Sequence, residues 1–138
     1  NARHYLGAAD WWPEHFGDLE KRTLEVIYRR GLLQLVEGKA DLGDGLTLLC
    51  APGETPGHQI LRVEAEDLVA YFTGDLYHHP LEFSETRNVR WADQDAMRTS
   101  KEALVDGAAE DNALVYFSHI GVPYRVKRVH GRASWEAA

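Results

Sequence analysis

The pattern of apolar and polar positions predicts two helices near the start of the chain. Residues 18–30 carry apolar side chains at helical spacing, and Gly31 offers a stop at their end. Residues 8–16 contain helix formers together with Pro13, which is tolerated in the first turn of a helix. We therefore expect a short helix followed by a longer one.

The middle of the chain has the pattern of β-strands. Apolar runs cover residues 32–38, 46–52 and 58–74, and a stretch rich in Gly and Asp separates the first two. Within the last run, Glu66 and Asp67 interrupt the apolar residues as the turn of a hairpin does. This pattern predicts about four strands in succession.

The last third of the chain predicts a helix and further strands. Residues 93–106 place apolar side chains one above another, with Asp93 as the N-cap and Gly107 near the end. Residues 113–119 form a short apolar run typical of a buried strand, and residues 124–136 alternate as a half-exposed hairpin does. Strands in the middle and at the end, with helices at the flanks, indicate a layered α/β fold.

Length and composition narrow the class of protein. The 138 residues fit one domain, 1–138, without repeats or a linker. No apolar run is long enough for a membrane helix, so we expect a soluble protein in the cytoplasm without a membrane partner. The net charge of -7 argues against a nucleic-acid partner, because phosphate groups attract basic surfaces.

The single cysteine and the first residue of the chain add two expectations. Cys50 excludes an internal disulfide, and its place at the end of an apolar run predicts a small core residue. The sequence starts with Asn1 and not with Met, and no signal segment follows. We therefore expect a processed or truncated start.

Three residues at the ends of predicted strands or loops are candidate metal ligands: His58, Asp75 and His119. Imidazole nitrogen suits zinc and similar divalent ions, and a carboxylate can bridge two of them. They lie far apart in the sequence and can meet only through tertiary structure. The alternative is that these residues have a structural role, because Asp is common in turns and a histidine at a strand end often only forms hydrogen bonds.

The segments APGETPGHQ, FTGDLYHHP and VYFSHIG, in this order, resemble the C-terminal half of the metallo-β-lactamase fold superfamily. The resemblance is to its lactonase-like and organophosphate-hydrolase-like branches and extends over nearly the whole chain. It implies an αββα sandwich. The chain then corresponds to the second half, a mainly antiparallel sheet with flanking helices.

The resemblance also implies roles for these residues. By matching motif, His58 helps to bind the first metal, Asp75 bridges both metals, and His119 binds the second. His78 stands where lactonase-like relatives have a tyrosine that contacts the substrate carbonyl and where some other members have histidine. His78 would then polarise a substrate oxygen; a turn histidine that merely packs is the alternative.

One part of the family pattern is absent. Members carry an upstream HxHxDH motif that supplies ligands to both metals, and this sequence contains no such motif. His78 and His79 do not replace it, because neighbouring residues on a strand point to opposite faces. We therefore expect the chain to be the second half of a larger domain; a natural short paralogue is the alternative.

The function implied by the resemblance is metal-dependent hydrolysis. Two divalent ions, which we expect to be zinc, share a hydroxide that attacks an ester, lactone or phosphoester in a small-molecule substrate. The segment alone is expected to be inactive. The alternative is a non-catalytic half-domain that forms a homodimer, or associates with the missing half-domain, through its exposed sheet face. A third hypothesis is that the chain is an unrelated small α/β domain.

Overall fold

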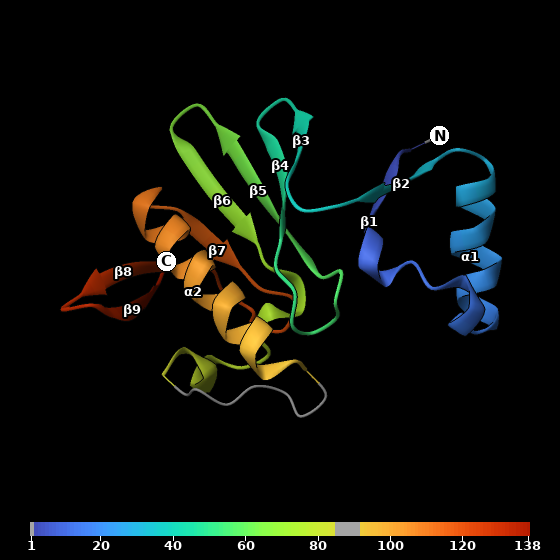
Figure 1. Ribbon diagram of the computed structural model, residues 1–138. Coiled ribbons are helices and arrows are strands. Elements are labelled where there is room, and N and C mark those ends of the chain that lie inside the picture. Colours follow the sequence, from blue (N-terminus) through green and yellow to red (C-terminus); the bar gives the residue numbers. More distant parts are fainter. Residues whose placement is uncertain (1, 85–91) are drawn as a thin grey trace.

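The structure, a computed structural model, describes residues 2–84 and 92–138 and shows an α/β fold (Figure 1). The helices are α1 (Asp18–Arg29) and α2 (Gln94–Glu110). The strands are β1 (His4–Gly7), β2 (Leu33–Val36), β3 (Ala40–Gly43), β4 (Leu46–Cys50), β5 (Gln59–Ala65), β6 (Leu68–Phe72), β7 (Leu114–Tyr116), β8 (Tyr124–Val129) and β9 (Arg132–Ala137). Short 3-10 turns cover Ala8–Asp10, Pro13–His15, Gly74–Leu76 and Pro80–Phe83.

The main sheet has the order β3-β4-β5-β6-β7-β8-β9. Neighbouring strands are antiparallel except β6 and β7, which are parallel and are joined by a crossover through α2. A parallel pair requires such a crossover, because a hairpin can join only antiparallel strands. The sheet is therefore mixed and mostly antiparallel, with helix α2 lying across it (Figure 1).

One face of this sheet packs against α2 and forms the core. Tyr71 on β6 pairs with Val115 on β7, and both side chains are almost fully buried. Helix α2 buries Met97, Leu104 and Ala108 against them, at the helical spacing that the sequence predicts. Asp93 caps the helix, as expected, because its side chain accepts hydrogen bonds from two N–H groups of the first turn.

The opposite face is also apolar but stays partly exposed within the described part of the chain. The register aligns Leu48, Leu61, Phe72 and Tyr116 across four neighbouring strands. Phe72 stacks on Tyr116 with ring centroids 4.9 Å apart, yet 45% of Phe72 is exposed. An apolar sheet face normally packs against another layer, so this face has the character of an interface.

The N-terminal region lies to one side of the main sheet (Figure 1). Strands β1 and β2 pair in parallel, and α1 connects them, as the longer predicted helix. Residues 8–16, expected as one short helix, form two 3-10 turns instead. Trp12 is the N-cap of the second turn, where Pro13 takes the first position.

Three further expectations from the sequence were wrong. The helix predicted over residues 93–106 continues to Glu110, so Gly107 lies inside α2, where a Cβ atom would lie 3.0 Å from the Tyr71 hydroxyl. Strand β3 forms in the Gly- and Asp-rich stretch that was read as a gap. Cys50 is exposed, and β3 pairs with β4 over Leu46–Leu48 and not as far as Cys50.

Among residues 2–84 and 92–138, neither helix has the length and apolar character that crossing a membrane demands.

Candidate metal centre

The topology of the sheet brings Asp75 and His119 to the same edge. Asp75 follows β6 and His119 follows β7. Because these two strands are parallel neighbours, their carboxyl ends meet at one edge. His58 directly precedes β5, which is antiparallel to β6, so it reaches this edge as well. The three residues that the sequence marked as candidate metal ligands therefore follow or precede strands at one edge of the sheet.

Hydrogen bonds connect the segment that follows β6 to the end of β7 and the segment that follows it. The backbone N–H and the hydroxyl of Thr73 both donate to the Tyr116 carbonyl, at 2.9 and 3.1 Å. The Ser118 N–H donates to the Gly74 carbonyl at 3.3 Å. Thr73 is fully buried. The backbone that carries Asp75 is thereby held against the backbone that carries His119.

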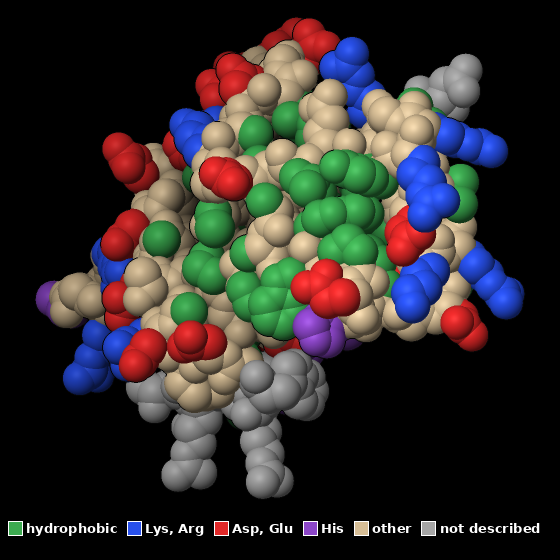
Figure 2. Space-filling model, turned by 45° about the vertical axis from the view of Figure 1, so that its right-hand side comes forward, with side chains coloured by type: hydrophobic (Ala, Val, Ile, Leu, Met, Phe, Trp, Pro, Cys, Tyr) green, Lys and Arg blue, Asp and Glu red, His purple; other side chains and the backbone are tan. Residues whose placement is uncertain are grey.

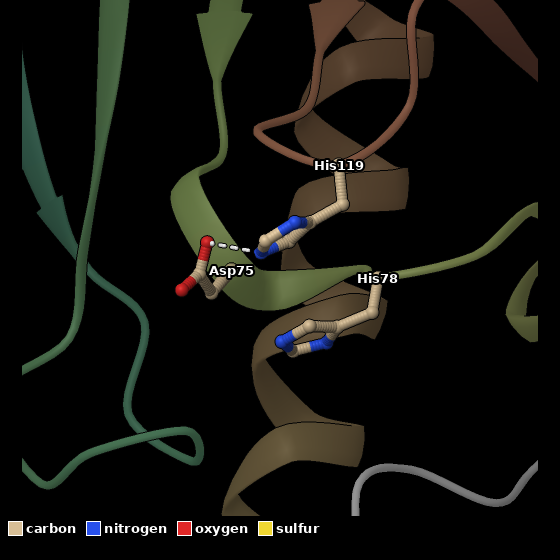
Figure 3. Close-up of side chains that lie close together, drawn as sticks. All are labelled: Asp75, His78 and His119. Atoms are coloured by element: carbon tan, nitrogen blue, oxygen red, sulfur yellow. Dashed lines mark ion pairs between the residues drawn. The ribbon is translucent and has the colours of Figure 1, made fainter.

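Three side chains form a cluster with metal-ligand chemistry: Asp75, His78 and His119 (Figure 3). The Asp75 Oδ1 lies 3.1 Å from the His119 Nε2. The His78 ring stacks on the His119 ring, with centroids 4.9 Å apart. One ligand atom from each residue lies within 4.8 Å of the others, and nearly half of the Asp75 and His119 side chains is exposed. The cluster is open to a ligand from solvent.

His58 contacts the backbone of this cluster but is not part of it. Its Nδ1 lies 3.0 Å from the Ala51 carbonyl, and its Nε2 accepts a hydrogen bond from the Asp75 N–H at 3.2 Å. This pair of bonds assigns the proton to Nδ1. The lone pair of Nε2, the one a metal would use, is directed at the Asp75 backbone. His58 as a metal ligand therefore stays a prediction.

The glycine of the Gly-Asp motif has a steric role. Gly74 has a φ of +55°, and a Cβ atom there would lie 2.9 Å from the His58 Nε2. A side chain at this position would thus meet the imidazole and strain the backbone. Gly74 allows the His58 ring to approach the turn that carries Asp75.

The loop that carries His58 is held by a residue that the sequence did not single out, Asp10. Its Oδ2 accepts from the Thr55 hydroxyl at 2.6 Å, and its Oδ1 accepts from the Gly57 N–H at 2.7 Å. Gly7 and Gly57 are in close contact, since a Cβ on Gly7 would lie 1.9 Å from the Gly57 carbonyl oxygen. Loops 8–10 and 55–58 are therefore fitted to each other, a contact that no sequence spacing marks.

Two carboxylates flank His78. The Glu54 Oε2 lies 4.0 Å from its Nε2, and the Glu82 Oε1 lies 3.9 Å from its Nδ1. Both carboxylate side chains are mostly buried. Neither residue was predicted from the sequence. Glu54 reaches His78 only through the fold, whereas Glu82 stands four residues after His78 and contacts it locally. Two acidic side chains thus lie next to His78, of which Glu82 is also paired with Lys101, at 2.6 Å.

The chemistry of the cluster fits one divalent ion. Two imidazoles and one carboxylate are a ligand set that zinc accepts, with bonds of about 2.0–2.2 Å. Donor atoms within 4.8 Å of one another can reach a common ion after small side-chain rotations. A pair of ions needs more ligands than this cluster holds, and the sequence lacks the HxHxDH motif.

Comparisons with known proteins identify the fold. No family model matches the sequence, and no curated protein matches it either. Solved structures do match. One is the hydrolase AbOPH of the beta lactamase superfamily, with a TM-score of 0.79 and 14% identity over 99% of this chain and 54% of the other. Another is AidC, a dizinc quorum-quenching lactonase, with a TM-score of 0.69 and 15% identity over 97% of this chain and 54% of the other.

A third structure is an N-acyl homoserine lactone hydrolase with its product bound at the catalytic metal centre. It has a TM-score of 0.57 and 25% identity over 64% of this chain and 36% of the other. The chain spans about half the length, or less, of these structures. Its mixed, mostly antiparallel sheet with flanking helices matches a half of the metallo-β-lactamase fold, as the sequence motifs predicted.

Proposed function

We propose that this chain is the C-terminal half of a metal-dependent hydrolase with the metallo-β-lactamase fold. The observation that carries the proposal is the meeting of Asp75, His78 and His119 at the carboxyl ends of two parallel strands. The structural neighbours support it at a coarser level, because they are lactonases and hydrolases, one of them a dizinc enzyme.

Asp75, His78 and His119 are the residues that we propose to hold a divalent ion, with zinc as the expected metal. A bound ion would supply a Lewis acid and make water a better nucleophile near neutral pH. The contribution of this chain is orientation. The hydrogen bonds between the segments that follow β6 and β7 hold Asp75 and His119 in place. If the His78 ring does not bind the ion, one of its N–H groups can donate a hydrogen bond to a substrate oxygen.

The second ion of a binuclear site depends on ligands from elsewhere. We propose that Asp75 bridges the pair and that His58 joins it, which requires His58 to release its hydrogen bond from the Asp75 N–H. The remaining ligands would come from the half of the domain that carries the HxHxDH motif. That half would also cover the partly exposed sheet face of Leu48, Leu61 and Phe72.

The proposed substrate is a small molecule with an ester, lactone or phosphoester bond. Two of the neighbours are named as a lactonase and a lactone hydrolase, each with a homoserine product bound. The exposed apolar sheet face favours a second candidate, a non-catalytic half-domain that pairs with a partner or with a second copy of the chain.

A combined measurement of metal content and hydrolysis tests the proposal. The purified chain would be analysed for bound metal and assayed with an N-acyl homoserine lactone and a phosphotriester, with zinc added. We expect zinc bound to the chain and hydrolysis near the background rate. A chain that binds no zinc contradicts the metal site, and rapid turnover that needs Asp75 contradicts the assignment as a half-domain.

A further inference from the structure

The backbone at His78 is held by a single buried carboxylate. The Glu82 Oε1 accepts hydrogen bonds from the N–H groups of His78 and His79, at 3.0 and 3.2 Å. The same oxygen lies 3.9 Å from the Nδ1 of His78. Glu82 thus contacts both the backbone and the surroundings of the ring that stacks on His119.

The other oxygen of Glu82 is paired with a lysine from helix α2. Lys101 Nζ donates to the Glu82 Oε2 at 2.6 Å, and it also lies 4.3 Å from the centre of the Tyr77 ring. Only 11% of the Lys101 side chain and 13% of the Glu82 side chain are exposed. Burial lowers the pKa of Lys101, and the hydrogen bond to Glu82 opposes this effect. The loop of His78 is thereby connected to the main helix of the fold.

A contribution to stability does not by itself explain the buried Glu82–Lys101 pair. Removing two charges from water is costly, and replacing a buried ion pair by apolar residues of similar size is often neutral or stabilising. An apolar side chain in place of Lys101 would lie next to the Tyr77 ring, over which the Lys101 Nζ lies now. What an apolar pair would not supply is an acceptor for the N–H groups of the His78 loop.

A purely local role for Glu82 explains only part of its contacts. Glu82 and His79 form a capping box at the start of the turn Pro80–Phe83. That role accounts for the bond from the His79 N–H. The bond from the His78 N–H and the pairing with Lys101 across the sequence lie outside it.

We infer that Glu82 is a positioning residue for the cluster of Asp75, His78 and His119, and that Lys101 is its counter-charge. Glu82 fixes the backbone of His78 so that its imidazole lies parallel to that of His119, at a ring spacing of 4.9 Å. Lys101 keeps the carboxylate in its buried position. The inference rests on the proposed metal centre for its function, while the positioning itself is a property of the protein without metal.

Two double variants of the whole chain separate positioning from charge. Glu82→Gln with Lys101→Met removes both charges but keeps a side-chain oxygen for the two N–H groups. Glu82→Leu with Lys101→Met removes the charges and the acceptor together. Each removes both charges of the Glu82–Lys101 pair together, so neither member of this pair stays buried alone, and both variants are expected to fold. Lys127→Met with Glu136→Gln breaks an exposed pair on the β8–β9 hairpin and is the matched control.

The first readout needs no metal. NMR signals of the His78 and His119 rings, and hydrogen exchange of the His78 amide, report whether the rings stay stacked and the amide stays bonded. We expect wild-type values in the control and in the Gln/Met variant. In the Leu/Met variant we expect shifted ring signals and faster exchange of this amide. Unchanged signals in the Leu/Met variant, with the protein folded, overturn the inference.

The second readout is zinc affinity, measured by competition with a chromogenic chelator. We expect the Leu/Met variant to bind zinc about 10–100-fold more weakly than the Gln/Met variant, the range typical of outer partners of metal ligands. Equal affinities would overturn the functional part of the inference. If wild-type protein binds no zinc at all, the proposed function fails, and the NMR comparison still decides whether Glu82 positions His78.

Discussion

At the scale of single residues, the neighbouring His58 ring explains why glycine stands at position 74 of the Gly-Asp motif. Gly74 and Gly31 both have positive φ, +55° and +68°, but only Gly74 has a close neighbour for a Cβ atom. The neighbour is the His58 Nε2, at 2.9 Å. A residue with a Cβ atom would therefore meet similar backbone strain at both positions but a steric contact only at position 74, which makes the two glycines a matched pair.

Gly74→Ala is expected to destabilise the protein more than Gly31→Ala. The left-handed backbone alone costs a residue with a Cβ atom about 1–2 kcal/mol, so both variants lose roughly this free energy of unfolding. Gly74→Ala loses more, because its methyl group displaces the His58 ring. Urea denaturation gives both values, and equal losses would show that His58 does not need Gly74.

Asp111 makes stability depend on acid pH. Arg62 donates to its Oδ2 at 2.8 Å and Tyr71 at 2.7 Å, and the hydrogen bond from Arg62 is the main reason that the pKa of Asp111 is lowered. The pKa of Tyr71 is raised to about 12, chiefly by burial, so its hydroxyl remains a donor. A carboxyl whose pKa is lower in the folded state contributes stability above its unfolded pKa of about 3.9.

That contribution is lost as the pH falls through the lower pKa of the folded state. We therefore expect the free energy of unfolding to fall on acidification below about pH 4, and Asp111→Asn to flatten this part of the curve. Urea denaturation at a series of pH values on both sides of about pH 4 measures this change in the free energy of unfolding. Asp106→Asn, an exposed carboxyl paired with Arg128, is the control. An unchanged slope in Asp111→Asn would show that other carboxyls cause it.

At the scale of elements, the sequence predicted those that local pattern determines. Helix α1, helix α2 with its cap at Asp93, and the β5–β6 hairpin follow from helical spacing, capping chemistry and turn residues. Strand β1 was missed, because it pairs in parallel with β2 across a helix and has only four residues. Such pairing depends on tertiary contacts that no local window contains.

The loop of His58 is the element whose order depends on a distant residue. Asp10 accepts bonds from Thr55 and Gly57. Asp10→Ala should leave the Gly57 N–H without its acceptor and speed its hydrogen exchange, whereas Asp10→Asn keeps an oxygen acceptor. NMR-detected exchange measures both. The same protection of Gly57 in Asp10→Ala as in the wild type would show that β5 alone orders the loop.

At the scale of the whole molecule, apolar side chains stay exposed on one face of the described part of the chain (Figure 2). Figure 2 shows hydrophobic side chains gathered in the middle of one face, with charged side chains around them. On the main sheet, Phe72 remains 45% exposed beside Tyr116. Since the chain spans about half the length of two of its structural neighbours, we expect the rest of such a domain to cover this sheet face.

The isolated chain is consequently expected to self-associate through that face. Phe72→Lys should shift the equilibrium toward the monomer, because a charge would have to be buried at the contact. Val129→Lys, at a similarly exposed position on the β8–β9 hairpin, is the control and should not. Sedimentation velocity over a range of concentrations measures the association. A monomer at every concentration, or equal effects of both variants, contradicts it.

The candidate site could be predicted only in part. The resemblance in sequence marked His58, Asp75 and His119 as metal ligands and His78 as a residue that contacts substrate, and parallel pairing of β6 and β7 explains why Asp75 and His119 meet. The stacking of His78 on His119 was not predicted, because it depends on the path of the loop after Asp75. Glu82 was not singled out either, although it stands only four residues after His78.

A zinc titration followed by NMR tests the central claim most directly. With one equivalent of zinc we expect the ring signals of His78 and His119 to shift, and those of His130, in the turn between β8 and β9 and outside the cluster, to stay unchanged. Asp75→Asn should weaken binding by at least about 10-fold, since even outer partners of metal ligands contribute that much. Shifts at His130 without shifts at His78 and His119, or undiminished affinity in Asp75→Asn, would contradict the metal centre.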